Sequence, residues 1–521
     1  MHDYVIVGAG SAGCALAARL TEDPSVSVLL VEAGPPDTEP ALHIPVAFSR
    51  LYRSPFDWDY ASGPEPALDD REIYVPRGRV LGGSSSLNAM IYIRGNRRDY
   101  DEWGRGWGWT DVLPYFKRAE GNERGADALH GAGGPLSVAD GRSRHPLAAA
   151  WIEAAAAAGL PRTDDFNGPG QDGVGFYQLT QRDGMRCSAA VAYLHPALGR
   201  PNLTLLPATL VTRVLFEGDR VAGVEAIVDG AAHTLPAGRE VVLSAGTYNT
   251  PQLLMLSGVG PAEHLREHGI AVRLDQPAVG AGLQDHINAG ITLSTDAESL
   301  MTAESAANVA LLQTEGRGPL TSNIAEAGGF WRTQAGLDAP DVQFHMAPAM
   351  FAQEGLVPPS EHAWSAGACV LRPAGRGEVR LRSADPADKP RILSRYLDSE
   401  RDWASMVAAV RLLMEIARQE PIAGMTTGPL QVPASDAEAD VRAHVRARAH
   451  CLYHPVGTCA LGRVVDAELR VVGVEGLRVA DASVIPSAPR GNTNAAAIMV
   501  GERAADLLAG HAPAAGVEAA A

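Results

Sequence analysis

A glycine-rich turn between a short apolar strand and a helix opens the chain, and it constrains the fold more than any other stretch. Asp3–Val7 predicts a buried strand, and Gly8–Gly13 follows it directly with the pattern G-x-G-x-x-G. Cys14–Leu20 then predicts a helix, and a second strand, Val26–Val31, ends at Glu32. A βαβ unit with this turn, and with an acid after its second strand, is typical of dinucleotide binding.

Each part of this unit has a physical reason. Gly8 allows the tight turn, Gly10 lets the backbone approach a pyrophosphate, and Gly13 lets the helix pack close to the strand. The helix N-terminus offers free N–H groups and a partial positive charge to a phosphate. Glu32 can accept hydrogen bonds from a ribose diol. We therefore predict cofactor contacts at Gly8, Gly10, Ser11, Ala12, Gly13, Glu32 and Ala33. A glycine-rich turn without function is the alternative, and the strand, helix and acid together disfavour it.

A second G-x-G-x-x-G match, Gly168–Gly173, has no apolar strand before it, so we predict a loop there. The chain then has one credible dinucleotide site. A single site favours a bound flavin over a flavin enzyme that also docks NAD.

Length, composition and charge limit the classes of protein to which the chain can belong. A chain of 521 residues with 46% apolar residues predicts two or more well-packed domains. No run of about 18 apolar residues exists, so we expect no membrane span, and the N-terminus predicts no secretory signal. The formal charge of −17 disfavours nucleic acid or an anionic membrane as a partner. Five scattered cysteines predict a reduced, cytoplasmic protein without disulfides.

A second glycine-rich stretch, Arg77–Asn88, contains Gly-Gly followed by three serines. Its backbone N–H groups and hydroxyls suit an anion or a polar ring edge. On this stretch alone, a flexible linker is an equally good interpretation.

Four stretches together make the chain similar to the glucose-methanol-choline (GMC) oxidoreductases, a family of FAD enzymes. They are Arg79–Asn88, Gly246–Gly260, Tyr453–Cys459 and Arg490–Asn494, and they follow the family's order. The resemblance implies an α/β fold, in which a Rossmann-like FAD-binding domain carries an inserted α+β substrate-binding domain built on an antiparallel sheet. It also implies non-covalent FAD, because Leu87 stands where some choline oxidases carry a histidine that bonds to the flavin.

The expected domains are discontinuous. Residues 1–145, 186–290 and 450–521 are assigned to the FAD-binding domain, and residues 146–185 and 291–449 to the substrate-binding domain. We expect helices over 151–159, 403–419, 436–449 and 495–508, strands within 203–246, an antiparallel strand at 377–382 and a disordered tail from residue 510.

The resemblance implies further cofactor contacts. They are Arg79, Leu81, Gly82, Gly83, Ser84, Asn88, Val211, Ala245, Gly246, Asp481, Ala482, Asn492, Thr493 and Asn494, with the backbone of Val211 facing the adenine. Val279–His286 departs from the family's usual VGENLQDH, and we assign no role to it.

Oxidation of an alcohol needs a hydride acceptor, a base and a group that holds the substrate oxygen. The flavin supplies the first. We predict His454 as the base because imidazole titrates near neutral pH, with a structural histidine as the alternative. Asn492 cannot act as a base at neutral pH but can orient the substrate oxygen, and a turn or helix cap is its alternative.

Two residues resemble substrate contacts of the choline-oxidising branch, Glu326 and His345, and we also assign Tyr453 to the substrate site. A structural glutamate is the alternative at position 326. His264–His268 fits the metal pattern H-x-x-E-H, but its polar surroundings predict a short exposed helix and no metal.

The predicted function is FAD-dependent oxidation of a primary alcohol to the aldehyde by hydride transfer to flavin N5. The partners are a small-molecule alcohol and oxygen or another electron acceptor. A GMC-fold lyase or another non-oxidising flavoprotein is the alternative, and an NAD dehydrogenase is a third reading. The alcohol, the acceptor and the oligomeric state stay open.

Overall fold

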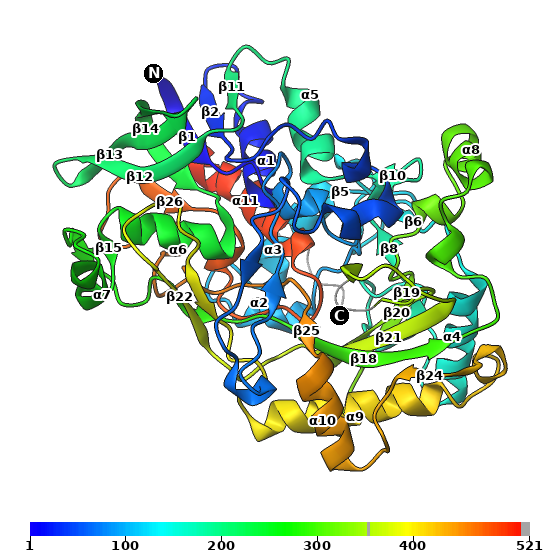
Figure 1. The fold of residues 1–521 in the computed structure, drawn as a ribbon. Helices are drawn as coiled ribbons and strands as arrows, with labels where there is room; N and C mark the ends of the chain where they lie inside the picture. Colours follow the sequence, from blue (N-terminus) through cyan, green and yellow to red (C-terminus); the bar gives the residue numbers. More distant parts are fainter. Residues whose placement is uncertain (352–354, 512–521) are drawn as a thin grey trace.

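The structure, a computed structural model, describes residues 1–351 and 355–511 and contains two seven-stranded sheets (Figure 1). The first sheet has the order β11-β2-β1-β14-β13-β12, with β26 also paired to β14. These strands are β11 (Leu203–Leu206), β2 (Val28–Val31), β1 (His2–Val7), β14 (Ala231–Leu243), β13 (Arg220–Val228), β12 (Leu210–Glu217) and β26 (Leu477–Val479). Strands β11, β2, β1, β14 and β26 are parallel, and β12, β13 and β14 form an antiparallel extension.

The parallel strands β1 and β2 are short apolar runs because helices cover the sheet. Helices α1 (Ser11–Leu20) and α11 (Asn494–Ala509) come from opposite ends of the chain and lie side by side, blue and red in Figure 1. A Cβ at Gly501 of α11 would lie 2.3 Å from the carbonyl oxygen of Ala12, so only glycine permits this approach. The first and last segments of the chain therefore share one hydrophobic core.

The second sheet is antiparallel, with the order β24-β18-β21-β20-β19-β7 and with β25 also paired to β18. These strands are β24 (Gly428–Gln431), β18 (Ile287–Ser294), β21 (Ala363–Val370), β20 (Val342–Ala347), β19 (Ala327–Trp331), β7 (Gly173–Phe176) and β25 (His450–Cys451). Helices α4 (Pro146–Ala157), α9 (Glu400–Ile416) and α10 (Glu438–Arg448) pack against this sheet. Trp151, Phe344 and Leu413 share a buried cluster between α4, α9 and the sheet.

Shorter elements complete the described chain. The strands are β3 (Tyr60–Ala61), β4 (Tyr74–Val75), β5 (Glu120–Asn122), β6 (Leu136–Asp140), β8 (Gln178–Leu179), β9 (Gln181–Arg182), β10 (Met185–Arg186), β15 (Val259–Gly260), β16 (Leu274–Asp275), β17 (Ala281–Leu283), β22 (Gly377–Arg380) and β23 (Arg391–Leu393). The helices are α2 (Arg97–Asp101), α3 (Trp109–Ala119), α5 (His195–Ala197), α6 (Gly246–Leu256), α7 (Ala262–Glu267) and α8 (Ala306–Glu315).

The predicted α/β class with two sheets is confirmed, and several local boundaries differ. Helix α4 begins at Pro146 rather than at Trp151, because His145 caps it and proline suits the first helical turn. Strand β22 pairs with β17 and β23 in a separate three-stranded sheet and not in the large antiparallel one.

The stretch around α7 also differs from the expectation. His264 is buried, and its Nε2 accepts the backbone N–H of Leu381 at 3.0 Å. One face of this helix is therefore packed against the protein, whereas we expected an exposed helix. Within the described ranges no group of histidines, cysteines and acids could hold a metal ion. In the same ranges no helix is long and apolar enough to cross a bilayer. All five cysteines are free and buried, and tail residues 512–521 lie outside the described residues.

Candidate active site

A cavity of about 610 Å³ lies between the two sheets and takes its walls from both. Seventeen of the residues predicted to bind the cofactor line it: Gly8, Gly10, Ser11, Ala12, Glu32, Ala33, Gly83, Ser84, Asn88, Val211, Ala245, Gly246, Asp481, Ala482, Asn492, Thr493 and Asn494. His454, His345 and Tyr453 line the same cavity. The fold therefore joins segments from across the chain into one continuous wall.

The turn after β1 has the geometry that a pyrophosphate requires. Gly8 has φ of +104°, and a Cβ there would lie 2.5 Å from the carbonyl oxygen of Ser244. The nearest atom to a Cβ on Gly10 would be the Cα of Gly83, at 4.0 Å, so this backbone stays open to the cavity. Among the described residues no side chain caps the N-terminus of α1, and its first turn carries no acid. These features fit a bound phosphate group.

Glu32 follows β2 and is buried beside this turn. Its Oε2 accepts the backbone N–H of Ala9 at 2.9 Å, and its Oε1 accepts that of Gly34 at 2.8 Å. Burial raises the pKa of Glu32 to about 7, although these N–H groups favour the ionised form. Each carboxylate oxygen still has lone pairs for a ribose diol.

Asp481, which follows β26, also lines the cavity. Its Oδ2 accepts the backbone N–H of Gly246 at 2.9 Å and the hydroxyl of Thr250 at 2.6 Å, which joins β26 to the start of α6. Ser11 at the start of α1 donates to Asn494 at the start of α11, at 2.7 Å. The N-termini of three helices, α1, α6 and α11, therefore meet along the cavity.

Four predicted cofactor contacts do not line the cavity. A Cβ on Gly13 would lie 1.9 Å from the carbonyl oxygen of Gly8, so this residue serves the packing of α1 on β1. Arg79 is exposed and lies over the ring of Trp58, and Leu81 packs into the hydrophobic core around β1 and β2. Gly82 has φ of +88° and shapes the loop before the 3-10 turn at Gly83–Ser86.

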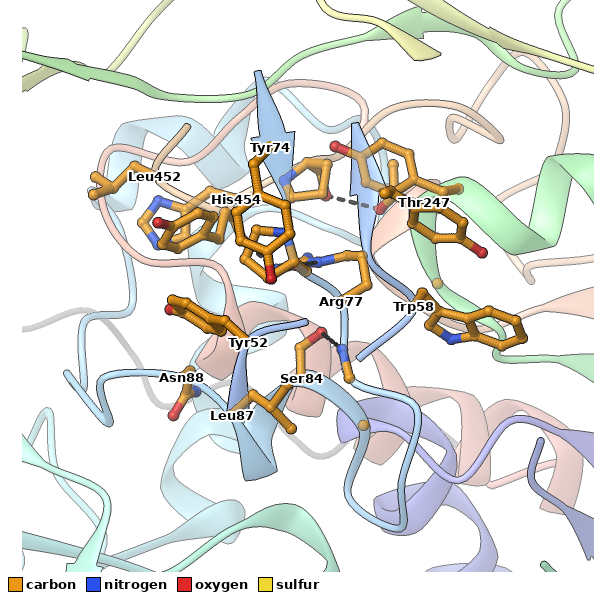
Figure 2. A pocket seen from close by; sticks show the side chains of 18 of the residues that line it. Tyr52, Trp58, Tyr74, Arg77, Ser84, Leu87, Asn88, Thr247, Leu452 and His454 are labelled. Atoms are coloured by element: carbon orange, nitrogen blue, oxygen red, sulfur yellow. Dashed lines mark hydrogen bonds between the residues drawn. The ribbon is translucent and has the colours of Figure 1, made fainter. Parts of the chain in front are cut away.

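The predicted catalytic pair is brought into contact. Nδ2 of Asn492 lies 3.1 Å from Nε2 of His454. Oδ1 of Asn492 accepts a hydrogen bond from Nε2 of Gln343 at 3.1 Å, which fixes the amide orientation. His454 is 8% exposed and stands above Tyr52 and beside Leu452 in Figure 2. An imidazole and an amide thus face one cavity from two distant segments of the chain.

Burial lowers the pKa of His454 well below its ordinary value, and His286, His345 and Arg77 add to the effect. The imidazole is therefore neutral at physiological pH. A neutral imidazole carries one bare nitrogen, which is the form that a general base needs.

Sequence reasoning missed two residues that hold His454, both in the stretch to which no role was assigned. Nδ1 of His286 lies 3.0 Å from Nδ1 of His454, and Asp285 accepts the backbone N–H of His454 at 2.7 Å. The signal was present, because Leu283–His286 keeps the last four letters of the family's VGENLQDH. The two departures earlier in that stretch obscured it.

The part of the cavity near His454 is walled by aromatic rings. Tyr52 lies at the centre of the group, with its ring centroid 5.9 Å from those of Phe48, Tyr74 and Tyr453. Figure 2 draws Tyr52, Tyr74 and His454 among the side chains that line this cavity. Tyr453 has φ of +72°, an uncommon backbone conformation for a bulky residue.

The structure places Glu326 away from this cavity, in contrast to the expected substrate contact. Its carboxylate accepts the hydroxyls of Ser143 at 2.7 Å and Ser322 at 2.6 Å, and the backbone N–H of His145 at 2.7 Å. The residue is 4% exposed and is not part of the cavity wall. These three donors turn the carboxylate toward the start of α4, which corresponds to the structural alternative.

A glycine turn open to the cavity, a buried acid beside it and a buried imidazole–amide pair fit an oxidoreductase with a dinucleotide cofactor. Residues 2–288 and 373–501 match two sequence profiles, both described as GMC oxidoreductase. The chain belongs to the GMC oxidoreductase family, which implies FAD as the cofactor and CH–OH groups as the site of reaction.

Known relatives cover almost the whole chain. Mitochondrial choline dehydrogenase of Mus musculus is 45% identical over 98% of this chain and 90% of its own length. The oxygen-dependent choline dehydrogenase of Brucella anthropi is 42% identical over 98% of this chain and 96% of its own. The crystal structure of pyridoxine 4-oxidase from Mesorbium loti superposes with a TM-score of 0.89 at 34% identity, covering 98% of this chain and all of that one.

Proposed function

We propose that this protein oxidises a primary alcohol to the aldehyde, with choline-like alcohols as the first substrates to test. The observation that carries the proposal is the contact between His454 and Asn492 in the wall of the cofactor cavity. The similarity to choline dehydrogenases supports the choice of substrate. The aromatic wall around Tyr52 is compatible with a quaternary ammonium through cation–π contact.

FAD, when bound, supplies the hydride acceptor at flavin N5. Nε2 of His454 takes the proton of the substrate hydroxyl, and Nδ2 of Asn492 donates a hydrogen bond to the substrate oxygen. Both atoms already face each other at 3.1 Å, so a hydroxyl that enters between them exchanges one hydrogen bond for two. Gln343 holds the amide in the donating orientation.

We also propose that FAD is held without a covalent bond. Leu87 lines the cavity and has no nucleophilic atom. Precipitation of the protein with acid should release all of the yellow colour to the supernatant, and colour retained in the pellet would contradict this assignment.

The division of the chain into FAD-binding and substrate-binding domains is part of the same proposal. Strands β7, β18 to β21 and β24 bring residues 173–176, 287–370 and 428–431 to the antiparallel sheet. The parallel sheet takes its strands from the two ends and the middle of the chain.

The test is the rate of flavin reduction by an alcohol without oxygen. His454→Ala should lower this rate by about 10²- to 10⁴-fold, the usual contribution of a general base, while FAD stays bound. His450→Ala is the matched control, because His450 also lines the cavity but bonds Asn288 and not His454. Near-normal reduction in His454→Ala would refute the assignment of the base.

A panel of choline and neutral aromatic and aliphatic alcohols then separates the substrate classes. A wild-type flavin that no alcohol bleaches would favour the alternative, a GMC-fold lyase or another non-oxidising flavoprotein. Readmitting air to a bleached sample distinguishes reoxidation by oxygen from a need for another acceptor.

A further inference from the structure

We propose that His286 is a positioning residue that sets the tautomer of His454, with the proton on Nδ1 and the lone pair on Nε2. The proposal rests on the proposed function of His454 as the base and deepens it. A neutral imidazole can serve as a base from one nitrogen only, so the tautomer decides whether that nitrogen faces the substrate.

The argument starts at a backbone carbonyl. Nε2 of His286 lies 3.0 Å from the carbonyl oxygen of Leu371, which can only accept a hydrogen bond. This nitrogen therefore carries the proton. Burial lowers the pKa of His286 to about 4, so the ring is neutral and its Nδ1 has a lone pair.

The contact between His286 and His454 then determines where His454 carries its proton. The two Nδ1 atoms are 3.0 Å apart, a hydrogen-bond distance that requires one proton between them. Since Nδ1 of His286 is bare, the proton belongs to Nδ1 of His454. Nε2 of His454 is then the bare nitrogen, and it is the atom that faces Asn492.

The opposite tautomer has a clear electrostatic penalty. A proton on Nε2 of His454 would leave two bare nitrogens facing each other at 3.0 Å in a fully buried contact. The orientation of Asn492 agrees with the proposed tautomer, because its Oδ1 is taken by Gln343 and its Nδ2 must find an acceptor. Both neighbours of His454 thus require the same proton position.

Asp285 fixes the distance between His286 and His454, and so the length of the hydrogen bond between their Nδ1 atoms. Its Oδ1 accepts the backbone N–H of His286 at 2.8 Å and that of His454 at 2.7 Å. Its Oδ2 accepts the hydroxyl of Tyr396 and the thiol of Cys451, both at 2.9 Å. One carboxylate that is 2% exposed therefore binds the backbones of both histidines.

The decisive experiment compares two substitutions in the FAD-loaded full chain. His286→Asn places an amide oxygen near the position of Nδ1 and keeps an acceptor for His454, whereas His286→Leu removes it. Both lose the contact with Leu371, so their difference isolates the acceptor. His264→Leu is the control, because it removes another buried histidine with a backbone hydrogen bond outside the cavity.

Nitrogen NMR of histidine-labelled protein reads the tautomer without any substrate, with the His454 signals assigned through His454→Asn. We expect a protonated Nδ1 and a bare Nε2 in the wild type and in His286→Asn, and a shift toward protonated Nε2 in His286→Leu. A protonated Nε2 in the wild type, or an unchanged tautomer in His286→Leu, would overturn the proposal.

Flavin reduction gives the functional readout. In serine proteases the loss of tautomer control costs about 10⁴-fold, and we expect His286→Leu to lower the limiting rate at least tenfold, with His286→Asn losing less and FAD content unchanged. Equal loss in the two variants, or none in either, would contradict the proposal. If His454→Ala does not reduce the flavin while His286→Leu reduces it at the wild-type rate, only the role of His286 is refuted. If His454→Ala reduces the flavin at the wild-type rate, the proposed function itself is refuted.

Discussion

Oδ1 of Asp285 accepts the backbone N–H of His454 at 2.7 Å, across 169 positions of the sequence. The bond joins the segment before β18 to the segment after β25, and these two strands also pair at Ile287 and Cys451. A buried carboxylate therefore holds the backbone that carries His454, the proposed base.

Asp285→Asn should destabilise the protein and the site together. An amide cannot accept at both of its heavy atoms, so at least one of four buried donors loses its partner, at a cost of about 1–3 kcal/mol. Thermal unfolding of the FAD-loaded protein measures the loss. Asp338→Asn, at an exposed position, is the control and should change stability by less than about 0.5 kcal/mol. A melting temperature equal to that of the wild type would contradict the role of Asp285.

Acidification should destabilise the wild type more than His286→Asn. The folded-state pKa of His286 is lowered to about 4 by burial, whereas its ordinary value is 6.5. Between these values the unfolded chain binds a proton that the folded protein does not, so stability falls as the pH falls through this window. When the pH is lowered from 7 to 5, the free energy of unfolding of the wild type should fall by about 2 kcal/mol more than that of the variant. His233→Asn, on the exposed part of β14, should follow the wild type; parallel curves for all three proteins would refute the prediction.

Gly83→Ala should weaken FAD binding. A Cβ at this position would lie 2.8 Å from the Cα of Gly10, and φ of +54° adds strain for a residue with a side chain. The two loops would have to separate where the phosphates are expected, so we predict a lower ratio of flavin to protein absorbance after purification. Gly218→Ala is matched for left-handed strain, with φ of +60°, but has no atom within 4 Å of its Cβ. Equal flavin loss in both variants would assign the effect to backbone strain alone.

Glu326→Gln should lower stability without changing substrate preference. The carboxylate accepts from three donors, and an amide nitrogen facing any of them costs about 1–3 kcal/mol. The ratio of kcat/KM for choline to that for a neutral alcohol should stay within about twofold of the wild type, since this carboxylate does not line the cavity. Glu72→Gln is the comparison, because Glu72 is an exposed carboxylate of the cavity wall. A selective loss of choline turnover in Glu326→Gln would restore the residue to the substrate site.

Much of this protein was predictable from local sequence. The turn at Gly8–Gly13 works through backbone conformation and close approach, which glycine and its spacing specify directly, and the structure shows both effects. His454 and Asn492 were predicted through the motifs around them, and the structure places them in contact. Helix limits were less certain, because caps such as His145 act outside the periodic pattern.

What the tertiary structure decided is the direction in which buried polar groups face. The sequence does not show whether Glu326 contacts a substrate or three structural donors. The packing of α4 against β19 brings the three donors to its carboxylate. His286 gains its role from Leu371 and His454, which lie far from it in the chain. Hydrogen bonds act over about 3 Å between atoms that folding brings together. Sequence therefore determined the cofactor fold and pointed to the residues proposed to react, and the three-dimensional structure determined the hydrogen-bond partners from which their proton positions are inferred.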